Sequence, residues 1–211
     1  MRKMTKIKIC GLMGMRDIEA VNEALPDYIG FVFAESRRRI SPELAMELKG
    51  KLDGRILAVG VFVDESPGIV ADLCAGGVID LIQLHGSEDE NYIEKLKSMN
   101  GVAGKPIIKA VRVKSRLDIE KAEGLPCDYL LLDAHSDRQA GGTGEGFDWS
   151  LAGKPSKPFF LAGGLNADNL LDAIDRVRPY GLDVSSGAET GGVKDRNKIL
   201  EIVKIVRGSD I

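Results

Sequence analysis

The sequence predicts one α/β domain folded as a closed (β/α)8 barrel, the TIM-barrel fold class. Short apolar runs alternate with amphipathic stretches along the whole chain, which is typical of a parallel sheet with helical connections. The runs number eight, and a chain of 211 residues gives each unit about 26 residues, which suits a compact barrel. No linker, repeat or low-complexity segment divides residues 1–211, so a single domain is expected. A doubly wound open sheet is the alternative topology.

The candidate strands are the apolar runs, and the candidate helices are the stretches between them with apolar residues at helical spacing. The strands are expected at Lys6–Ile9, Tyr28–Val32, Ile56–Phe62, Leu81–Leu84, Ile107–Val111, Tyr129–Leu132, Phe159–Ala162 and Leu182–Val184. The helices are expected at Met15–Glu23, Ser41–Lys49, Pro67–Ala75, Glu88–Leu96, Leu117–Ala122, Asn169–Val177 and Asn197–Val206. The segment after the sixth run is poor in helical pattern, and only a single turn is expected there, at Asp148–Ala152.

Several helices carry a start signal. Ser41-Pro42 and Ser66-Pro67 each place a capping residue before a proline at the first helical position. Asp168 and Asp195 are the expected caps of the last two helices, because a side-chain oxygen there accepts hydrogen bonds from the free N–H groups.

The composition excludes several classes of protein. A net charge of −3, from 29 basic and 32 acidic residues, argues against broad electrostatic binding to nucleic acid or to anionic membranes. No apolar stretch approaches the roughly 20 residues that span a bilayer, and the run after the basic N-terminus is too short for a secretory signal. The three widely spaced cysteines, Cys10, Cys74 and Cys127, predict reduced thiols in a cytoplasmic protein, and nothing resembles a metal site.

Polar residues stand where the predicted strands end. Cys10 follows the first run, His85 the fourth, Arg112 the fifth and Asp133 the sixth. In a barrel the carboxyl ends of the strands line the active-site face, so the thiol and the carboxylate are expected at the same mouth. The sequence therefore predicts a candidate base and a candidate acid around one pocket.

Glycines gather after the last three predicted strands. Gly141–Gly144 follow the sixth run, Gly163-Gly164 the seventh and Ser185–Gly187 the eighth. Glycine lets the backbone approach a ligand closely, and free N–H groups near a helix start bind anions. The loops after strands seven and eight are the usual phosphate site of such barrels, so a phosphorylated small molecule is the expected ligand.

Nine short segments, in this order, resemble the phosphoribosylanthranilate isomerase family of tryptophan biosynthesis over essentially the whole chain. They are Lys8–Gly11, Gly30–Phe33, Ser36–Pro42, Val59–Val63, Gln83–Gly86, Leu132-Asp133, Gly141–Gly144 with Phe147–Trp149, Leu161–Asn166 and Asp183–Gly187. The resemblance implies conversion of N-(5-phosphoribosyl)anthranilate into 1-(2-carboxyphenylamino)-1-deoxyribulose 5-phosphate. This Amadori rearrangement involves no redox change and no cofactor.

The implied reaction needs two groups that move protons. An acid protonates the ribose ring oxygen so that the ring opens, and a base then removes the proton from C2. The resemblance assigns the base to Cys10 and the acid to Asp133. An electropositive environment would favour a Cys10 thiolate, and burial or a nearby carboxylate would raise the pKa of Asp133 as an acid requires.

The resemblance also implies substrate contacts. It implies that Arg38 binds the carboxylate of the anthranilate, for which a planar guanidinium is well suited. Arg37 and Arg39 remain candidates for this role. His85 is expected to support the site rather than to transfer a proton. The remaining predicted contacts are Gly142, Gly163, Gly164, Asp183, Ser185 and Ser186.

A few segments depart from the family pattern or carry no expected role. Glu145-Gly146 stand where lysine and threonine are frequent, and Ala188–Gly192 is shortened. Trp149 is expected to anchor the short turn after the sixth strand. The cluster Lys194–Arg196 is interpreted as the solvated start of the last helix.

Two other functions remain open at this point. One is another sugar-phosphate isomerase, epimerase or lyase on the same barrel, since a fold does not fix a function; Cys10 and Arg38 argue for the isomerase. The other is a non-catalytic subunit that binds a phosphoribosyl ligand, against which the intact acid and base argue. Either a monomer or a homodimer is compatible with the sequence.

Overall fold

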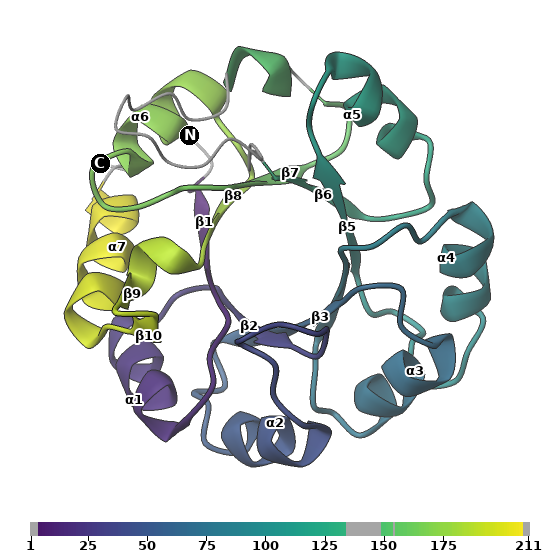
Figure 1. The fold of residues 1–211 in the computed structure, drawn as a ribbon, viewed down its shortest axis with the longest axis horizontal. Helices are drawn as coiled ribbons and strands as arrows, with labels where there is room; N and C mark the ends of the chain where they lie inside the picture. The colour runs from purple at the N-terminus through teal and green to yellow at the C-terminus, as the bar shows by residue number, and fades with distance from the viewer. Residues whose placement is uncertain (1–3, 134–148, 154, 209–211) are drawn as a thin grey trace.

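The computed structural model describes residues 4–133, 149–153 and 155–208 as a closed barrel of eight parallel strands in sequence order, drawn in Figure 1. The strands are β1 (Lys6–Cys10), β2 (Tyr28–Val32), β3 (Leu57–Phe62), β4 (Leu81–Leu84), β5 (Ile107–Arg112), β6 (Tyr129–Asp133), β7 (Phe159–Ala162) and β8 (Gly181–Val184). The predicted barrel is confirmed, and each strand lies within one residue of its predicted bounds. The alternative open sheet is wrong, because β1 pairs with β8 and places Lys8 opposite Asp183.

Helices form a ring around the barrel, as Figure 1 shows. They are α1 (Met15–Ala24), α2 (Pro42–Lys49), α3 (Pro67–Ala75), α4 (Glu90–Lys97), α5 (Arg116–Glu123), α6 (Leu170–Val177) and α7 (Arg196–Gly208). Between β6 and β7 the described residues form one short 3₁₀ helix, η1 (Trp149–Ala152), which confirms the turn predicted there. Trp149 is half-buried and packs against the core, as an anchor of this turn would.

Two of the predicted helix caps are present. The Ser41 hydroxyl oxygen accepts the Leu44 N–H at 3.2 Å, which is worth about 1 kcal/mol to α2. Asp195 accepts the N–H of Asn197 at the start of α7, with an N···O distance of 2.9 Å.

The other two cap predictions are wrong. Ser66 makes no capping hydrogen bond, although α3 begins at Pro67 as predicted. Asn169, not Asp168, precedes α6. Asn169 accepts the Asn166 N–H through its side chain, and this turn shifts the helix start one residue along the chain.

The barrel interior has two chemically different ends. An apolar cluster fills the barrel from the amino ends of the strands, at Tyr28, Leu81, Ile108 and Phe160, and continues further along them at Val59, Ala110, Leu131 and Ala162. Towards the carboxyl ends the inward positions become polar, at Lys8, Cys10, Gln83, His85, Asp133 and Asp183. Since all eight strands are parallel, these polar side chains face one mouth.

A hairpin follows β8, in the segment that the sequence predicts to be shortened. Here η2 (Ser186–Ala188) leads into β9 (Glu189–Thr190), which pairs antiparallel with β10 (Val193–Lys194). The turn between them is Gly191-Gly192, with φ of 60° and 85°. A tight two-residue turn needs positive φ at both positions, which glycine adopts without strain. The hairpin places Lys194 directly opposite Glu189.

In the described part of the chain no helix is both long and apolar enough to cross a membrane.

Candidate active site

The Cys10 thiol lies at the end of β1, against the neighbouring strand β2. Its register partner there is Gly30. A Cβ atom at position 30 would come within 2.7 Å of the Cys10 Sγ, so only glycine leaves room for the thiol. Cys10 is 8 % exposed, which places it just inside the mouth of the barrel.

Opposing influences act on the ionisation of Cys10. Burial raises the pKa of the thiol, while the charge and hydrogen bonding of Lys8 and the charge of Lys194 lower it. Asp183 adds to the effect of burial, and the net result is a raised pKa. The electropositive environment expected around Cys10 is therefore present, but it does not outweigh burial in this structure.

Asp133 ends β6 and is half-buried beside His85. The Nε2 atom of His85 lies 3.4 Å from Oδ2 of Asp133, and its Nδ1 lies 3.1 Å from the side-chain nitrogen of Gln83. The side-chain nitrogen of Gln83 faces Nδ1, which leaves Nε2 of His85 facing Asp133. Gln83 is 1 % exposed. These contacts fit the supporting role expected for His85.

One of the three consecutive arginines turns into the site. The Arg38 side chain crosses Gly11, where an added Cβ would collide with the Arg38 Cδ, and Gly11 has a φ of +83°. Arg38 makes two hydrogen bonds to Glu189, from Nε at 2.7 Å and from a terminal nitrogen at 3.1 Å. Arg37 also donates to Glu189 at 2.6 Å, but 56 % of its side chain is exposed, against 21 % for Arg38.

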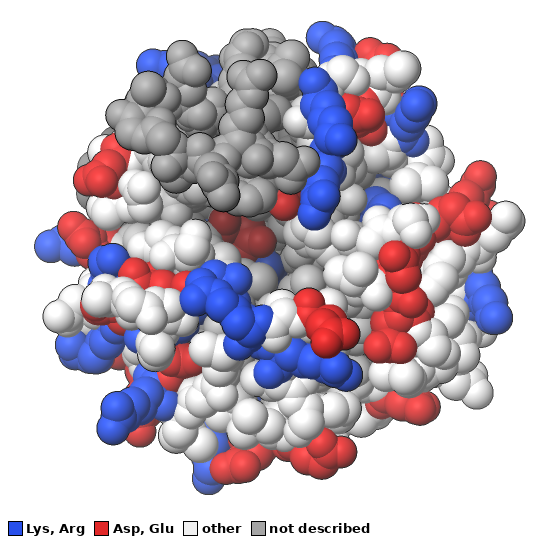
Figure 2. Space-filling model, in the orientation of Figure 1, with Lys and Arg blue, Asp and Glu red and all other residues white. Residues whose placement is uncertain are grey.

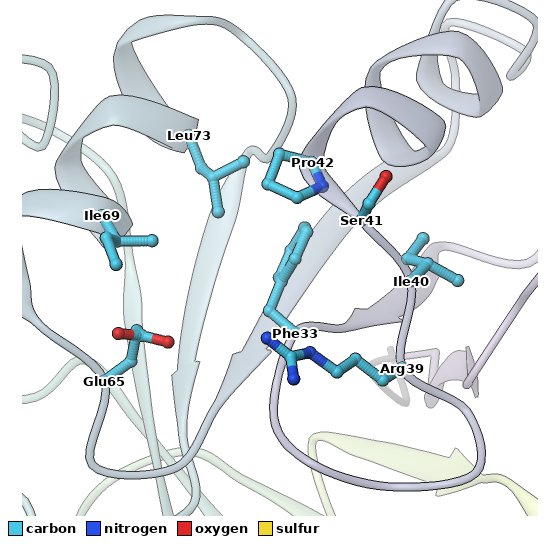
Figure 3. Close-up of a pocket in the computed structure, with 8 residues that line it drawn as sticks. All are labelled: Phe33, Arg39, Ile40, Ser41, Pro42, Glu65, Ile69 and Leu73. Atoms are coloured by element: carbon cyan, nitrogen blue, oxygen red, sulfur yellow. The ribbon is translucent and has the colours of Figure 1, made fainter.

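Arg39 points elsewhere. It lines a separate cavity of about 420 Å³ between α2 and α3, shown in Figure 3, together with Phe33, Ile40, Ser41, Pro42, Glu65, Ile69 and Leu73. In this view the Arg39 guanidinium lies below Phe33, on the side towards Glu65. Of the three arginines, Arg38 is therefore the best placed to meet a ligand at the barrel mouth.

Glu189 and Lys194 form a buried ion pair behind Arg38. The Lys194 ammonium lies 2.8 Å from the Glu189 carboxylate and 3.0 Å from the Ser185 carbonyl oxygen. Burial opposes the charge on Glu189, but hydrogen bonds from Arg38 and Lys194 outweigh it and hold the pKa of Glu189 at about 2. The prediction that Lys194 is solvated is wrong, because the hairpin folds this side chain inwards until 1 % of it remains exposed.

The glycine-rich loops after β7 and β8 lie back to back. Gly187 stands so close to the Leu165 carbonyl that a Cβ there would collide with it. Gly163 and Gly164 have φ of 92° and 68°. Outside the helices and strands, the backbone N–H groups of Gly164 and Ser186 donate to no backbone acceptor among the described residues. Such free N–H groups suit an anionic oxygen.

The predicted residues are thus brought together around one opening. The strand order β6, β7, β8, β1 places the two glycine-rich loops between Asp133 on one side and Cys10 on the other. The Ser185 hydroxyl donates to the Cys10 carbonyl oxygen at 3.2 Å, which joins the β8 loop to the end of β1. Figure 2 shows the surface hollowed over the barrel axis, with basic and acidic side chains both present around the hollow.

Two predicted contacts need comment. Asp183 lies inside the barrel, where both of its carboxylate oxygens are held by Lys8 at 3.0 and 3.1 Å. Its carboxylate is therefore engaged by the protein. Gly142, and with it the departure at Glu145-Gly146, lies outside the described residues.

Sequence reasoning missed Lys8, Gln83, Glu189 and Lys194 as members of this site. A signal was present for Lys8 and Gln83, because each stands two residues before a predicted site residue in a strand and so shares its face. Glu189 and Lys194 are buried because of the hairpin. The local pattern of apolar residues did not indicate that this hairpin forms. In the described residues no group of three or more His, Cys, Asp or Glu side chains is arranged to hold a metal ion.

Comparison with known proteins agrees with this geometry. Residues 7–205 match the family model described as N-(5'phosphoribosyl)anthranilate (PRA) isomerase. The chain is 48 % identical to N-(5'-phosphoribosyl)anthranilate isomerase of Endomicrobium trichonymphae over 204 residues, covering 97 % of this chain and 99 % of that protein.

Two solved structures of such isomerases also match. One contains bound reduced 1-(o-carboxyphenylamino)-1-deoxyribulose 5-phosphate, with 35 % identity, a TM-score of 0.82, and coverage of 97 % of this chain and 100 % of that one. The other shows monomers of the dimeric enzyme from Thermotoga maritima, with 35 % identity, a TM-score of 0.80 and the same coverage. The chain belongs to the N-(5'-phosphoribosyl)anthranilate isomerase family.

Proposed function

We propose that Cys10 and Asp133 carry the two proton transfers of the isomerisation that this family performs in tryptophan biosynthesis. The observation that supports this most is their placement: both end a strand at the same mouth, with the glycine-rich loops of β7 and β8 between them. A phosphate bound at those loops would lie between the acid and the base, and the ribose attached to it would reach both.

The protons that the two residues give and take balance over one catalytic cycle. Asp133 in its acid form gives its proton to the ribose ring oxygen, the C1–O bond breaks, and the ring opens to an iminium. Cys10 as thiolate takes the proton from C2, and the C2 electron pair forms the enolamine. The enolamine then tautomerises to the aminoketose. Asp133 regains a proton and Cys10 loses one to solvent, so the enzyme returns to its starting state.

Arg38 is proposed to bind the carboxylate of the anthranilate ring. Its guanidinium already donates to the Glu189 carboxylate. Because the pKa of Glu189 is low, this carboxylate stays charged and holds the arginine in place. A planar guanidinium bound on one edge can still offer the other edge to a second carboxylate. The substrate would then be fixed at both ends, by Arg38 and by the backbone N–H groups around Gly164 and Ser186.

The remaining parts of the proposal are coarser. The ligand is a phosphoribosyl small molecule, and the chain acts as a monomer or a homodimer. A cytoplasmic location is supported by the cysteines, all three of which are free and buried in the structure.

The test is turnover of freshly made phosphoribosylanthranilate, followed by loss of substrate fluorescence. Wild-type protein is expected to convert it, and Cys10→Ser and Asp133→Asn are each expected to lower kcat/KM by about 10²–10⁴-fold. Cys74→Ser is the matched control for the thiol, since Cys74 is buried in α3. Asp72→Asn, exposed on the same helix, is the control for the carboxylate.

Full activity in both site variants would contradict the proposed roles and favour a non-catalytic function. No turnover by well-folded wild-type protein would contradict the activity itself.

A further inference from the structure

A fully buried lysine lies beneath the proposed base. Lys8 is 0 % exposed and stands two residues before Cys10 in β1, so both side chains point into the barrel. A buried ammonium is costly unless it is paired. Lys8 has one carboxylate partner, Asp183, which lies opposite it in the β1–β8 register.

The pair is arranged so that Lys8 also acts on the thiol. Both carboxylate oxygens of Asp183 lie about 3 Å from the Lys8 ammonium, at 3.0 and 3.1 Å. Cys10 lies two residues further along β1, on the same face as Lys8, so its thiol is exposed to the charge of this ammonium, which favours the thiolate. Burial alone would lower the pKa of Lys8, but Asp183 and Cys10 outweigh it and raise the pKa, so Lys8 stays charged.

The other charged groups that face Cys10 come from two more elements. Asp183 of β8 opposes ionisation of the thiol, and Lys194 of β10 favours it less strongly than Lys8 does. From β2 the neighbour is Gly30, which has no side chain. Lys194 is itself tied to Glu189 and to the Ser185 carbonyl oxygen. Lys8 is therefore the main cationic partner of the thiol.

We infer that Lys8 enables Cys10 to lose its proton, and that Asp183 sets the strength of this effect by holding the Lys8 ammonium. Lys8 and Asp183 are positioning residues: neither exchanges a proton during the reaction. This assigns Asp183 a role different from the substrate contact expected of it. The inference rests on the proposed role of Cys10 as the base.

Two variants of the same pair should move Cys10 in opposite directions. Asp183→Asn leaves Lys8 with Cys10 as its nearest anionic partner. The midpoint of the Cys10 titration should therefore fall by about one pH unit. Lys8→Met combined with Asp183→Ala removes the cation without leaving a buried unpaired carboxylate, so the thiol should ionise about one pH unit higher. A purely structural pair would not produce shifts of opposite sign.

The readout is the thiolate absorbance at 240 nm as a function of pH. Each variant is compared with the same variant carrying Cys10→Ser, so that the difference isolates this thiol. Lys109→Met combined with Glu88→Ala is the matched control, because Lys109 and Glu88 form a second buried ion pair, 2.8 Å apart, and neither is among the main influences on Cys10. It should leave the titration of Cys10 unchanged. The acidic limb of the kcat/KM profile should follow the same two shifts.

An unchanged Cys10 titration in both folded variants would overturn the inference, as would shifts of the same sign. Should the double variant fail to fold, Lys8→Gln combined with Asp183→Asn replaces it and is compared with Asp183→Asn alone, so that the two differ only in the Lys8 charge. Ionisation of Cys10 at a higher pH when Lys8 is also replaced supports the inference, and no difference between the two overturns it. Because the titration needs no turnover, it is independent of the proposed function. Opposite shifts together with a fully active Cys10→Ser would overturn the role of Cys10 as base, while the coupling of Lys8 to the thiol would be supported.

Discussion

The two ends of the barrel interior are built from the same strands and use burial for opposite purposes. At the amino end, Tyr28, Tyr129, Phe160 and Tyr180 pack their rings together, with the Tyr129 centroid 5.9 Å from Phe160 and 5.0 Å from Tyr180. At the mouth, the Lys8–Asp183 pair is buried. Burying aromatic rings stabilises the fold, whereas burying charges costs free energy and changes the reactivity of their neighbours.

This difference explains why the site lies where it does. The apolar end fills the barrel and supplies stability through burial, so the mouth can contain charged groups that cost free energy to bury unless they are paired. Both effects act on the Cys10 thiol, because burial raises its pKa and the charge of Lys8 lowers it. Substitutions at the amino end should therefore change stability alone. Substitutions at the mouth should change activity, and where they remove a buried ion pair they should also change stability in a way that depends on pH.

The largest effect expected at the amino end comes from Phe160→Ala. Phe160 is fully buried and contacts three tyrosine rings, so its loss should lower the free energy of unfolding by about 3–5 kcal/mol. Denaturant unfolding measures this, with Leu171→Ala, 51 % exposed on α6, as control. The kcat of the folded fraction should stay close to wild type. A loss of kcat without a loss of stability would contradict the claim that the amino end serves stability and the mouth serves activity.

At the mouth, Arg38→Met should act mainly on substrate binding. Loss of a charged hydrogen-bonded contact worth about 1.5–3 kcal/mol should raise KM by roughly 10–100-fold. Arg39→Met is the matched control, because Arg39 lines the separate cavity of Figure 3, and it should leave KM unchanged. Steady-state kinetics on both variants decides between Arg38 and Arg39, and a raised KM only in Arg39→Met would contradict the assignment.

The Glu189 ion pairs should contribute a stability that depends on pH. The pKa of Glu189 in the fold is about 2, below its ordinary value of 4.5, so the contribution is complete above pH 4.5 and is lost as the pH falls towards 2. The Tm of wild type should exceed that of Glu189→Gln by a few degrees at pH 6, and the gap should shrink between pH 4.5 and 2. Thermal unfolding across this range measures it; a gap independent of pH would show that the charge of Glu189 is not what stabilises the hairpin.

The smallest effect is expected from Tyr180→Phe. It removes the hydrogen bond between the Tyr28 and Tyr180 hydroxyls, 2.9 Å apart, and keeps the ring packing. The free energy of unfolding should fall by about 1 kcal/mol, with kcat and KM unchanged. A change in kcat/KM here would show that the amino end is coupled to the site.

The sequence predicted the fold closely because the period of apolar residues marks each strand and helix locally. Cys10 and Asp133 could be placed at one mouth for the same reason, since each directly ends or follows such a run. Asp183 and Lys194 could not be interpreted this way. Asp183 pairs with Lys8 only because the barrel closes between two strands whose residues are 175 positions apart. Lys194 is buried only because the Gly191-Gly192 turn folds it onto Glu189.

The central claim, that Cys10 takes the C2 proton while Asp133 opens the ring, is tested most directly with substrate deuterated at ribose C2. In Cys10→Ser, removal of the C2 proton should limit the rate, so kcat should show a primary isotope effect. In Asp133→Asn, ring opening should limit the rate, so the isotope effect should be absent. The reverse pattern, or the same isotope effect in both variants, would contradict the assignment of base and acid.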